Sequence, residues 1–377
     1  MDGSDQLKRI DRATLTPVVR RALGEDAEIA DWRARSLADN LFRQTEGIYR
    51  VSGTARLGAD LKPWSLVLKV IRPLLAEDPL VEGTRRELDA YRSGLLGDLS
   101  GGLRAPEYYG LDHRDDGFIW LWLEEVEDVF GGNWPLSRYH LAARHLGQFN
   151  GEYLTAKPVP TASWLSRDVF ESWPDIYERA YRRYPSIRHE PLARRVWPDD
   201  VAEGTLRLWA ERGMFSDALR RLPKTFCHLD AFKRNLLARQ GSDGSDETVA
   251  IDWAFAGIGA IGAELAPLVT ATVALWEVDL ASIRELSEAT MDGYLAGLRD
   301  VGWAGDPRTV RLGYAVASIV RYAVTCFPVL AVEDGPRQML ERFSGHPIGE
   351  TCDRWAEVQR FHLKLAEEAR ELLGLVG

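Results

Sequence analysis

The chain has few cysteines and an excess of negative charge. Its three thiols, Cys227, Cys326 and Cys352, are scattered along 377 residues, so neither a disulfide framework nor a zinc site is expected. We expect them to be small buried apolar residues in a reducing, cytoplasmic environment. Lys and Arg total 47 against 57 Asp and Glu, which gives a formal net charge of −10. A protein that binds nucleic acid by neutralising phosphates needs the opposite sign, so no nucleic-acid partner is expected.

Long hydrophobic runs are also lacking. The chain has no uninterrupted run of about 18 apolar residues, which argues against a membrane-spanning helix and a membrane partner. The first residues, Met1 to Gln6, are acidic and polar and lack the apolar core of a signal peptide. The composition that remains, 45% hydrophobic and 28% charged, is that of a globular protein. The length allows two lobes that share a cleft.

The most informative segment is the run His-Leu-Asp-Ala-Phe-Lys-Arg-Asn at residues 228–235, which Ile-Asp-Trp follows at residues 251–253. Its polar residues stand in the order that a magnesium-dependent phosphoryl-transfer site needs. Asp230 would take the proton of an attacking hydroxyl, Asn235 would hold a magnesium ion from the same loop, and Asp252 would hold metal from the next strand. A structural pair of His228 and Asp230 beneath a loop is the alternative.

Two short strands are predicted between Asn235 and Asp252, at residues 236–239 and 248–251. Residues 240–247 are polar and Gly-containing, as in a turn. The resulting hairpin would bring Asp252 back beside Asn235.

This combination resembles the catalytic core of the aminoglycoside phosphotransferase and choline kinase superfamily, the small-molecule relatives of protein kinases. Their pattern is His-x-Asp-x-x-x-x-Asn, followed by a hydrophobic residue, Asp and often Trp. The resemblance covers about residues 30–268 and is closest at residues 226–253. It implies an ATP- and Mg²⁺-dependent kinase that moves the γ-phosphoryl group to a hydroxyl of a small molecule.

The predicted fold is α+β and two-lobed, like that of protein kinases. A nucleotide-binding N-terminal lobe (1–126) would contain a small five-stranded antiparallel sheet and one main helix, and a hinge (127–135) would lead to a larger, mainly helical C-terminal lobe (136–377) with the catalytic loop and the acceptor site. Periodicity predicts strands at 30–36, 47–53, 64–71, 107–111 and 118–123. Helices are predicted at 14–23, 82–96, 136–154, 198–219, 265–278, 283–297, 309–323 and 353–373.

Lys69 is a charged residue inside an otherwise apolar predicted strand, which calls for a partner or an exposed edge. The resemblance implies that this third-strand lysine reaches the α- and β-phosphates and is held by a glutamate of the following helix. Glu87 is the candidate partner. Glu82 competes, but it stands at the start of the helix, where it would favour the helix dipole. A snorkelling lysine and a solvated glutamate are the structural alternatives.

The phosphate-covering loop is expected within residues 40–51, with Thr45 and Gly47 contacting the nucleotide. Small residues there let backbone N–H groups approach phosphate oxygens. Gly47 is the only glycine in this stretch, so an ordinary turn is the alternative.

Other polar residues near the motif allow two interpretations. Lys233 and Arg234 would either stabilise charge on the γ-phosphoryl group or be solvated loop charges. Glu264 would be a structural or helix-start residue, or a substrate ligand. His228 is expected to hold the loop rather than to transfer protons, and Trp253 to pack.

A protein kinase is a poor alternative, because the chain has no Asp-Phe-Gly. His113-Arg114-Asp115 does occur, but it lies in the small lobe, and Trp120 stands where the motif requires Asn. A catalytically silent nucleotide-binding module remains an alternative from another class.

The acceptor is predicted only by class. Residues 163–197 are rich in Trp, Tyr, Arg and Pro and would form an insertion beside the cleft. An acidic and aromatic rim would favour an amine-bearing polyol such as an amino sugar or aminoglycoside. Choline-like alcohols, neutral sugars and hydroxy amino acids are the alternatives, and the oligomeric state and the choice of ATP over GTP stay open. The rim residues would be Asp168, Glu171, Trp173, Asp175 and Tyr177.

Overall fold

A computed structural model describes residues 4–38, 45–74 and 81–376. The chain divides into two compact units. The N-terminal unit comprises Met1–Asp98 and Ala105–Glu127, and the C-terminal unit comprises Leu99–Arg104 and Asp128–Gly377.

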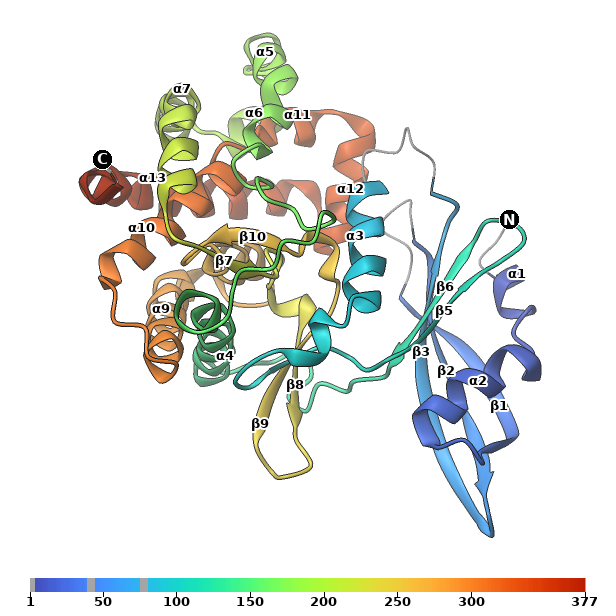
Figure 1. Ribbon diagram of the computed structural model, residues 1–377. Coiled ribbons are helices and arrows are strands. Elements are labelled where there is room, and N and C mark those ends of the chain that lie inside the picture. The colour runs from blue at the N-terminus through green and yellow to red at the C-terminus, as the bar shows by residue number, and fades with distance from the viewer. Residues whose placement is uncertain (1–3, 39–44, 75–80, 377) are drawn as a thin grey trace. The chain divides into compact units, whose positions relative to one another are not determined.

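The N-terminal unit is built on one five-stranded sheet in the order β1-β2-β3-β6-β5, in which every neighbouring pair is antiparallel (Figure 1). Helix α3 (Val81–Arg92) follows the third strand, as predicted. The α+β class with a five-stranded antiparallel N-terminal sheet is therefore confirmed. The strands are β1 (Glu28–Ala38), β2 (Thr45–Leu57), β3 (Asp60–Ile71), β5 (Tyr108–His113) and β6 (Ile119–Glu124).

Alternation along β3 decides which side chains enter the core of this unit. Leu66, Leu68 and Val70 are buried in one cluster with residues of helix α2 (Arg12–Leu23). Because successive side chains of a strand point to opposite faces, Lys69 lies on the other face of the sheet. Helix α2 begins where the Asp11 carboxylate accepts the backbone N–H of Thr14 at 2.8 Å, an N-terminal cap. A short helix, α1 (Ser4–Leu7), precedes it.

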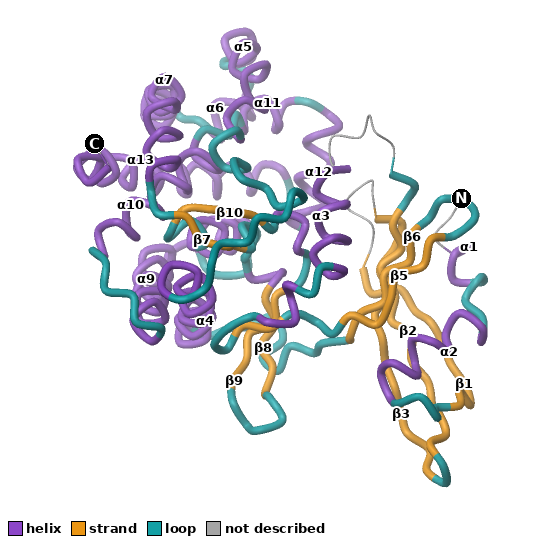
Figure 2. The backbone as a smooth tube through the Cα atoms, viewed as in Figure 1, coloured by secondary structure: helices purple, strands orange, loops and turns teal. Residues whose placement is uncertain are grey.

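The C-terminal unit is mainly helical, as predicted, with small sheets inside it (Figure 2). The helix predicted at 265–278 is present but ends at Ala274, and it contains a π-helical turn, η5 (Pro267–Ala271), before α8 (Thr272–Ala274). Four α-helices in the described part of this unit were not predicted: α5 (Glu178–Ile187), α6 (Pro191–Val196), α11 (Phe327–Val332) and α12 (Asp334–Ser344). The other helices are α4 (Leu136–Thr155), α7 (Asp199–Arg221), α9 (Ile283–Asp300), α10 (Pro307–Ser318) and α13 (Ile348–Leu372).

Short strands in this unit escaped prediction because long-range pairing defines them. β7 (Lys224–Cys227) pairs with β10 (Gly257–Ala260) in an antiparallel ladder. β4 (Leu103–Arg104) pairs in parallel with β9 (Asp246–Ala250). That pairing draws Leu99–Arg104 into the C-terminal unit, although the sequence placed these residues in the N-terminal lobe.

One helical stretch, Pro307–Val332, is long and apolar enough to cross a membrane, and 83% of its most apolar window is buried inside the protein. The expectation that no stretch qualifies was wrong, because it considered only uninterrupted apolar runs. The three cysteines are buried and free, as expected from their spacing.

Candidate active site

The motif that begins at His228 lies in a loop after β7 and in the hairpin that follows it. The hairpin consists of β8 (Leu236–Gln240) and β9 (Asp246–Ala250), with Leu236 opposite Ala250. Directly after β9, the backbone N–H of Ile251 donates to the carbonyl of Asn235 at 2.9 Å. The expected hairpin is therefore present, and it returns the chain to Asn235 one residue before Asp252.

Asp230 is held from two sides. The side-chain amide of Asn235 donates from Nδ2 to the Asp230 carbonyl at 3.0 Å and to carboxylate Oδ2 at 3.1 Å. Arg321 donates from Nη2 to the other carboxylate oxygen, Oδ1, at 2.5 Å. Both oxygens of the carboxylate are thus hydrogen-bonded, which fixes its orientation. Arg321 is 91 residues further along the chain and was not among the predicted site residues.

The electrostatics of Asp230 combine burial with a strong counter-charge. Burial raises the pKa of the Asp230 carboxyl to about 6, and the neighbouring charge of Asp252 acts in the same direction. The Arg321 charge and the hydrogen bonds from Arg321 and Asn235 oppose that rise. A carboxyl group with such a pKa suits general-base chemistry near neutral pH.

His228 and Glu264 hold the backbone of the loop. The neutral ring of His228 donates from Nε2 to the Ile251 carbonyl at 2.9 Å, and its Nδ1 accepts the backbone N–H of Asp230 at 3.2 Å. Burial lowers the pKa of His228 to about 4, which agrees with a neutral ring. Glu264 accepts the backbone N–H groups of His228 at 2.5 Å and Leu229 at 3.1 Å. Burial raises the pKa of Glu264 to about 7.

Arg321 lies in a shell of aromatic rings. Its guanidinium carbon is 4.9 Å from the ring centroid of Phe170, 5.2 Å from Trp173 and 5.0 Å from Phe255. Tyr322 lies at 5.3 Å. Only 6% of Arg321 is exposed, so a buried cation is compensated by Asp230 and by aromatic faces.

Neither cation of the motif is a simple solvated loop charge. Lys233 is buried and donates to the Asp128 carboxylate at 2.9 Å, with its ammonium 4.6 Å from the ring centroid of Trp134. Arg234 donates from Nε to Glu277 at 2.6 Å, and its other nitrogens donate to backbone carbonyls. Both cations therefore serve contacts within the C-terminal unit.

In the N-terminal unit, Lys69 meets the glutamate expected for it. Lys69 Nζ lies 2.6 Å from Glu87 Oε2, with side-chain exposures of 15% and 4%. The competing Glu82 is 70% exposed at the start of α3 and pairs with Arg85 at 3.2 Å. The contact explains how a lysine is accommodated inside an apolar strand.

The residues expected to cover the phosphates are only partly described. Residues 39–44 of the predicted loop lie outside the described residues. Thr45 and Gly47 lie at the start of β2. Thr45 pairs with Ile71 of β3 and Gly47 pairs with Val70, and the register shifts between these two pairs. A Cβ at Gly47 would lie 2.1 Å from the hydroxyl oxygen of Tyr49, so a side chain there would displace that ring.

The donor set fits a hard cation. The Asn235 amide nitrogen donates to Asp230, so the amide oxygen is the atom of this side chain that would bind a cation. A carboxylate and an amide oxygen are suitable for Mg²⁺, which takes its remaining ligands from water and substrate phosphates. Within residues 4–38, 45–74 and 81–376, no three His, Cys, Asp or Glu side chains form a metal cluster.

The five rim residues predicted in the insertion have different surroundings. Glu171 is buried and pairs with Lys224 at 2.6 Å, and Trp173 packs on Phe255. Asp168 and Asp175 are exposed. Tyr177 ends the 3₁₀ turn η2 (Trp173–Tyr177), where burial raises its pKa. The insertion therefore contributes aromatic rings around Arg321 as well as exposed carboxylates.

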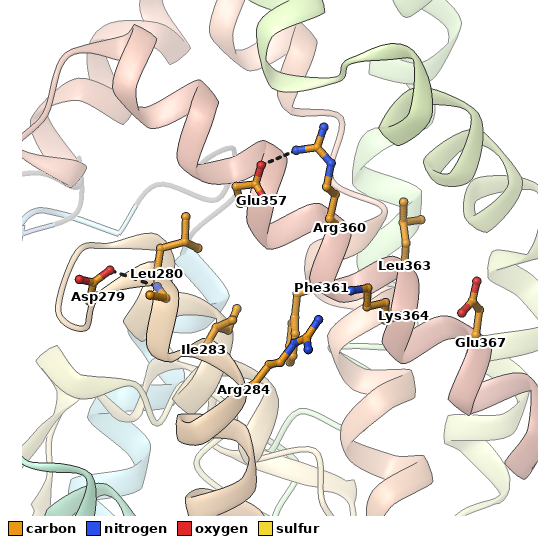
Figure 3. Close-up of a pocket in the computed structure, with 11 residues that line it drawn as sticks. Asp279, Leu280, Ile283, Arg284, Glu357, Arg360, Phe361, Leu363, Lys364 and Glu367 are labelled. Carbon is orange, nitrogen blue, oxygen red and sulfur yellow. Dashed lines mark hydrogen bonds and ion pairs between the residues drawn. The ribbon is translucent and has the colours of Figure 1, made fainter.

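A separate surface groove of about 770 Å³ lies between α13 and the start of α9. Figure 3 shows its lining, in which cations such as Arg284 and Lys364 stand beside apolar side chains and carboxylates. None of the motif residues lines this groove, and we assign it no role in the reaction.

The fold and the loop define a kinase-like phosphotransferase, and comparison with known proteins identifies the family. The model of the phosphotransferase enzyme family matches residues 48–305, more than half of the chain. The chain belongs to this family, which confirms the resemblance seen in the sequence. Comparison with curated proteins gave no significant match.

Solved structures share the fold at low sequence identity. A choline kinase from Cryptosporidium parvum is 13% identical, with a TM-score of 0.54 and coverage of 96% of this chain and 97% of that chain. An amicoumacin kinase in complex with AMP-PNP and Ca²⁺ is 15% identical, with a TM-score of 0.51 and coverage of 92% and 96%. A spectinomycin phosphotransferase in complex with ADP and spectinomycin is 14% identical, with a TM-score of 0.51 and coverage of 93% and 99%.

Proposed function

We propose that this protein is a cytoplasmic, ATP- and Mg²⁺-dependent kinase that transfers the γ-phosphoryl group to a hydroxyl of a small molecule. The observation that carries the proposal is the Asp230–Asn235 pair, joined by hydrogen bonds of 3.0 and 3.1 Å, with Asp252 at the end of the adjoining hairpin. Membership of the phosphotransferase family supports it.

Each residue has a proposed task. Asp230 orients the acceptor hydroxyl and takes its proton as the oxygen attacks. Asn235 and Asp252 hold the Mg²⁺, which neutralises charge on the nucleotide phosphates when bound. Lys69, held by Glu87 at 2.6 Å, binds the α- and β-phosphates.

The proposal also divides tasks between the units. The N-terminal unit binds the nucleotide, with Thr45 and Gly47 contacting its phosphates through the backbone. The C-terminal unit carries the catalytic loop and the acceptor site. An amine-bearing polyol is the first acceptor to test, because Asp168 and Asp175 of the insertion are exposed carboxylates.

An ADP-release screen tests the proposal. Acceptors would include amino sugars and aminoglycosides, choline-like alcohols, neutral sugars and hydroxy amino acids, each with ATP and Mg²⁺. We expect Mg²⁺-dependent ADP release with one class and phosphorylated acceptor in equal amount. Nucleotide binding without release in any class would indicate a silent module and refute the proposed activity.

The variant Asp230→Asn tests the catalytic assignment. Loss of the general base should lower transfer by about 10²–10⁴-fold and leave ATP affinity near that of the wild type. Asp243→Asn is the matched control, because Asp243 lies in the hairpin turn and accepts hydrogen bonds only from Ser245 among the contacts of the described chain. Wild-type turnover in Asp230→Asn would show that another group accepts the proton.

A further inference from the structure

The strongest unassigned feature is the cation against the proposed base. Arg321 donates from Nη2 to Asp230 Oδ1 at 2.5 Å, and its Nη1 donates to the carbonyl of Leu229. One guanidinium thus donates hydrogen bonds to both the Asp230 carboxylate and the backbone carbonyl of the preceding residue. Asn235 donates to the second carboxylate oxygen at 3.1 Å. Rotation of the carboxylate would therefore break the hydrogen bond from Arg321 or the one from Asn235.

The position of Arg321 is itself maintained by local structure. It lies in η7 (Ile319–Ala323), a π-helical turn that directly continues α10. The N–H of Val324 donates to the carbonyl of Ile319 at 3.1 Å. These residues are five apart, the spacing that defines a π-helical turn. π-helical turns are rare, occur mostly as single turns within α-helices, and frequently lie at functional sites.

The aromatic shell makes the guanidinium rigid. Phe170 and Trp173 come from the insertion, Phe255 follows the metal-binding residue Asp252 in sequence, and all three rings lie within 5.2 Å of the guanidinium carbon. The faces of these three rings contact the guanidinium of Arg321. They therefore stabilise the position of Arg321 without a bound ligand.

We infer that Arg321 is a positioning residue for phosphoryl transfer, which fixes the Asp230 carboxylate in the orientation that receives the acceptor's proton. This inference rests on the proposed function. It predicts that the loss of Arg321 impairs transfer to the acceptor while nucleotide binding persists, because misplacement of a reacting group lowers turnover rather than nucleotide affinity.

The chain contains a matched control, Arg354. It is buried like Arg321, with 7% exposure, it donates to the backbone carbonyl of Val273 at 2.6 Å, and its guanidinium carbon lies 4.2 Å from the ring centroid of Trp276. It differs in having no hydrogen bond to the catalytic loop among the described residues. Arg354→Met therefore shows how far the loss of a buried, ring-stacked arginine lowers the thermal midpoint and kcat when the arginine has no contact with Asp230.

The first measurement needs no activity. Thermal midpoints of Arg321→Met, Asp230→Asn and the double variant form a cycle, and a second cycle replaces Arg321→Met with Arg354→Met. We expect the first double variant to lose clearly less than the sum of its single losses, because each single change leaves a buried charge without its partner. The Arg354 cycle should be additive. Additivity in the first cycle would overturn the inference.

The second measurement uses the acceptor found in the ADP-release screen. Arg321→Met should lower kcat by about 10²-fold with little change in the Michaelis constant for ATP. Arg321→Lys should retain part of the activity, and added guanidinium, below denaturing concentrations, should restore part of the kcat of Arg321→Met. Wild-type kcat in Arg321→Met would overturn the inference, as would a loss that Arg354→Met shares and guanidinium does not restore. Absence of transfer by the wild type would refute the proposed function, and the thermal cycle would still decide the pairing.

Discussion

The contact between Lys69 and Glu87 allows a direct test of the proposed nucleotide site by Glu87→Gln. The change keeps the length of the side chain and removes its charge. Lys69 Nζ lies 2.6 Å from Glu87 Oε2, and the two side chains are 15% and 4% exposed. The lysine would lose the carboxylate that fixes its ammonium, and the N-terminal unit would lose a mostly buried ion pair.

The expected size of the effect follows from this burial. Removing one partner from a buried pair costs about 3–5 kcal/mol of unfolding free energy, whereas a surface pair contributes about 0–1 kcal/mol. Because Lys69 keeps 15% exposure, water can partly solvate its freed charge. We therefore expect a loss of about 2–3 kcal/mol. If about half of that interaction energy also serves to orient Lys69 toward the phosphates, the Michaelis constant for ATP rises about tenfold.

Equilibrium urea unfolding and ATP titrations would be measured for Glu87→Gln, Lys69→Met and the double variant. Glu125→Gln is the control, because it breaks a more exposed ion pair of the same unit, Arg50–Glu125 at 2.9 Å with exposures of 36% and 18%. The control should lose at most about 1 kcal/mol and keep its ATP dependence. A double variant worse than Lys69→Met by the full effect of Glu87→Gln would show that the two residues do not act as a pair.

Two further changes test the proposed metal site and the acid sensitivity of the core. Asp252→Ala should lower turnover more than Asn235→Ala, since it removes a full charge, and both should need more Mg²⁺ for half-maximal activity; an unchanged Mg²⁺ optimum and rate in Asp252→Ala would place the metal elsewhere. Burial lowers the pKa of His362 from 6.5 to about 3. Below pH 6.5 the unfolded chain therefore takes up a proton that the folded protein does not, and the free energy of unfolding decreases as the pH is lowered. His362→Gln removes this penalty, and its stability relative to the wild type should improve by about 2 kcal/mol between pH 7 and 5 in urea unfolding; parallel pH curves would contradict the buried neutral ring.

The parts of the site that the sequence predicts are those specified by local pattern. Asp230 and Asn235 share one loop, and a hairpin whose strands are β8 and β9 returns the chain to Asp252. Lys69 was detectable because a charged residue interrupts an apolar strand, and its partner lies in the next helix. Spacing within some twenty residues therefore predicts which groups come together.

Arg321 was missed because its partner lies 91 residues away. A signal was nevertheless present, since it interrupts the apolar stretch Pro307–Val332, much as Lys69 interrupts its strand. A charge at a buried position needs a partner, but the sequence does not say which carboxylate provides it. The strands β7, β10 and β4 escaped for the same reason, because pairing between distant segments creates them.

The backbone of the loop shows why distant residues are needed at all. Leu229 and Asp252, both within the motif, have φ angles of 63° and 60°, a left-handed conformation that a leucine adopts only at a cost of about 1–2 kcal/mol. Glu264 accepts the N–H of Leu229 at 3.1 Å, and Arg321 donates to its carbonyl. Both polar groups of this strained peptide segment are thus tied to residues outside the loop. The motif supplies the chemical groups, whereas the conformation that presents Asp230 also depends on two residues outside it. Glu264 was expected as a structural or helix-start residue or a substrate ligand, and no local pattern around the motif would reveal Arg321.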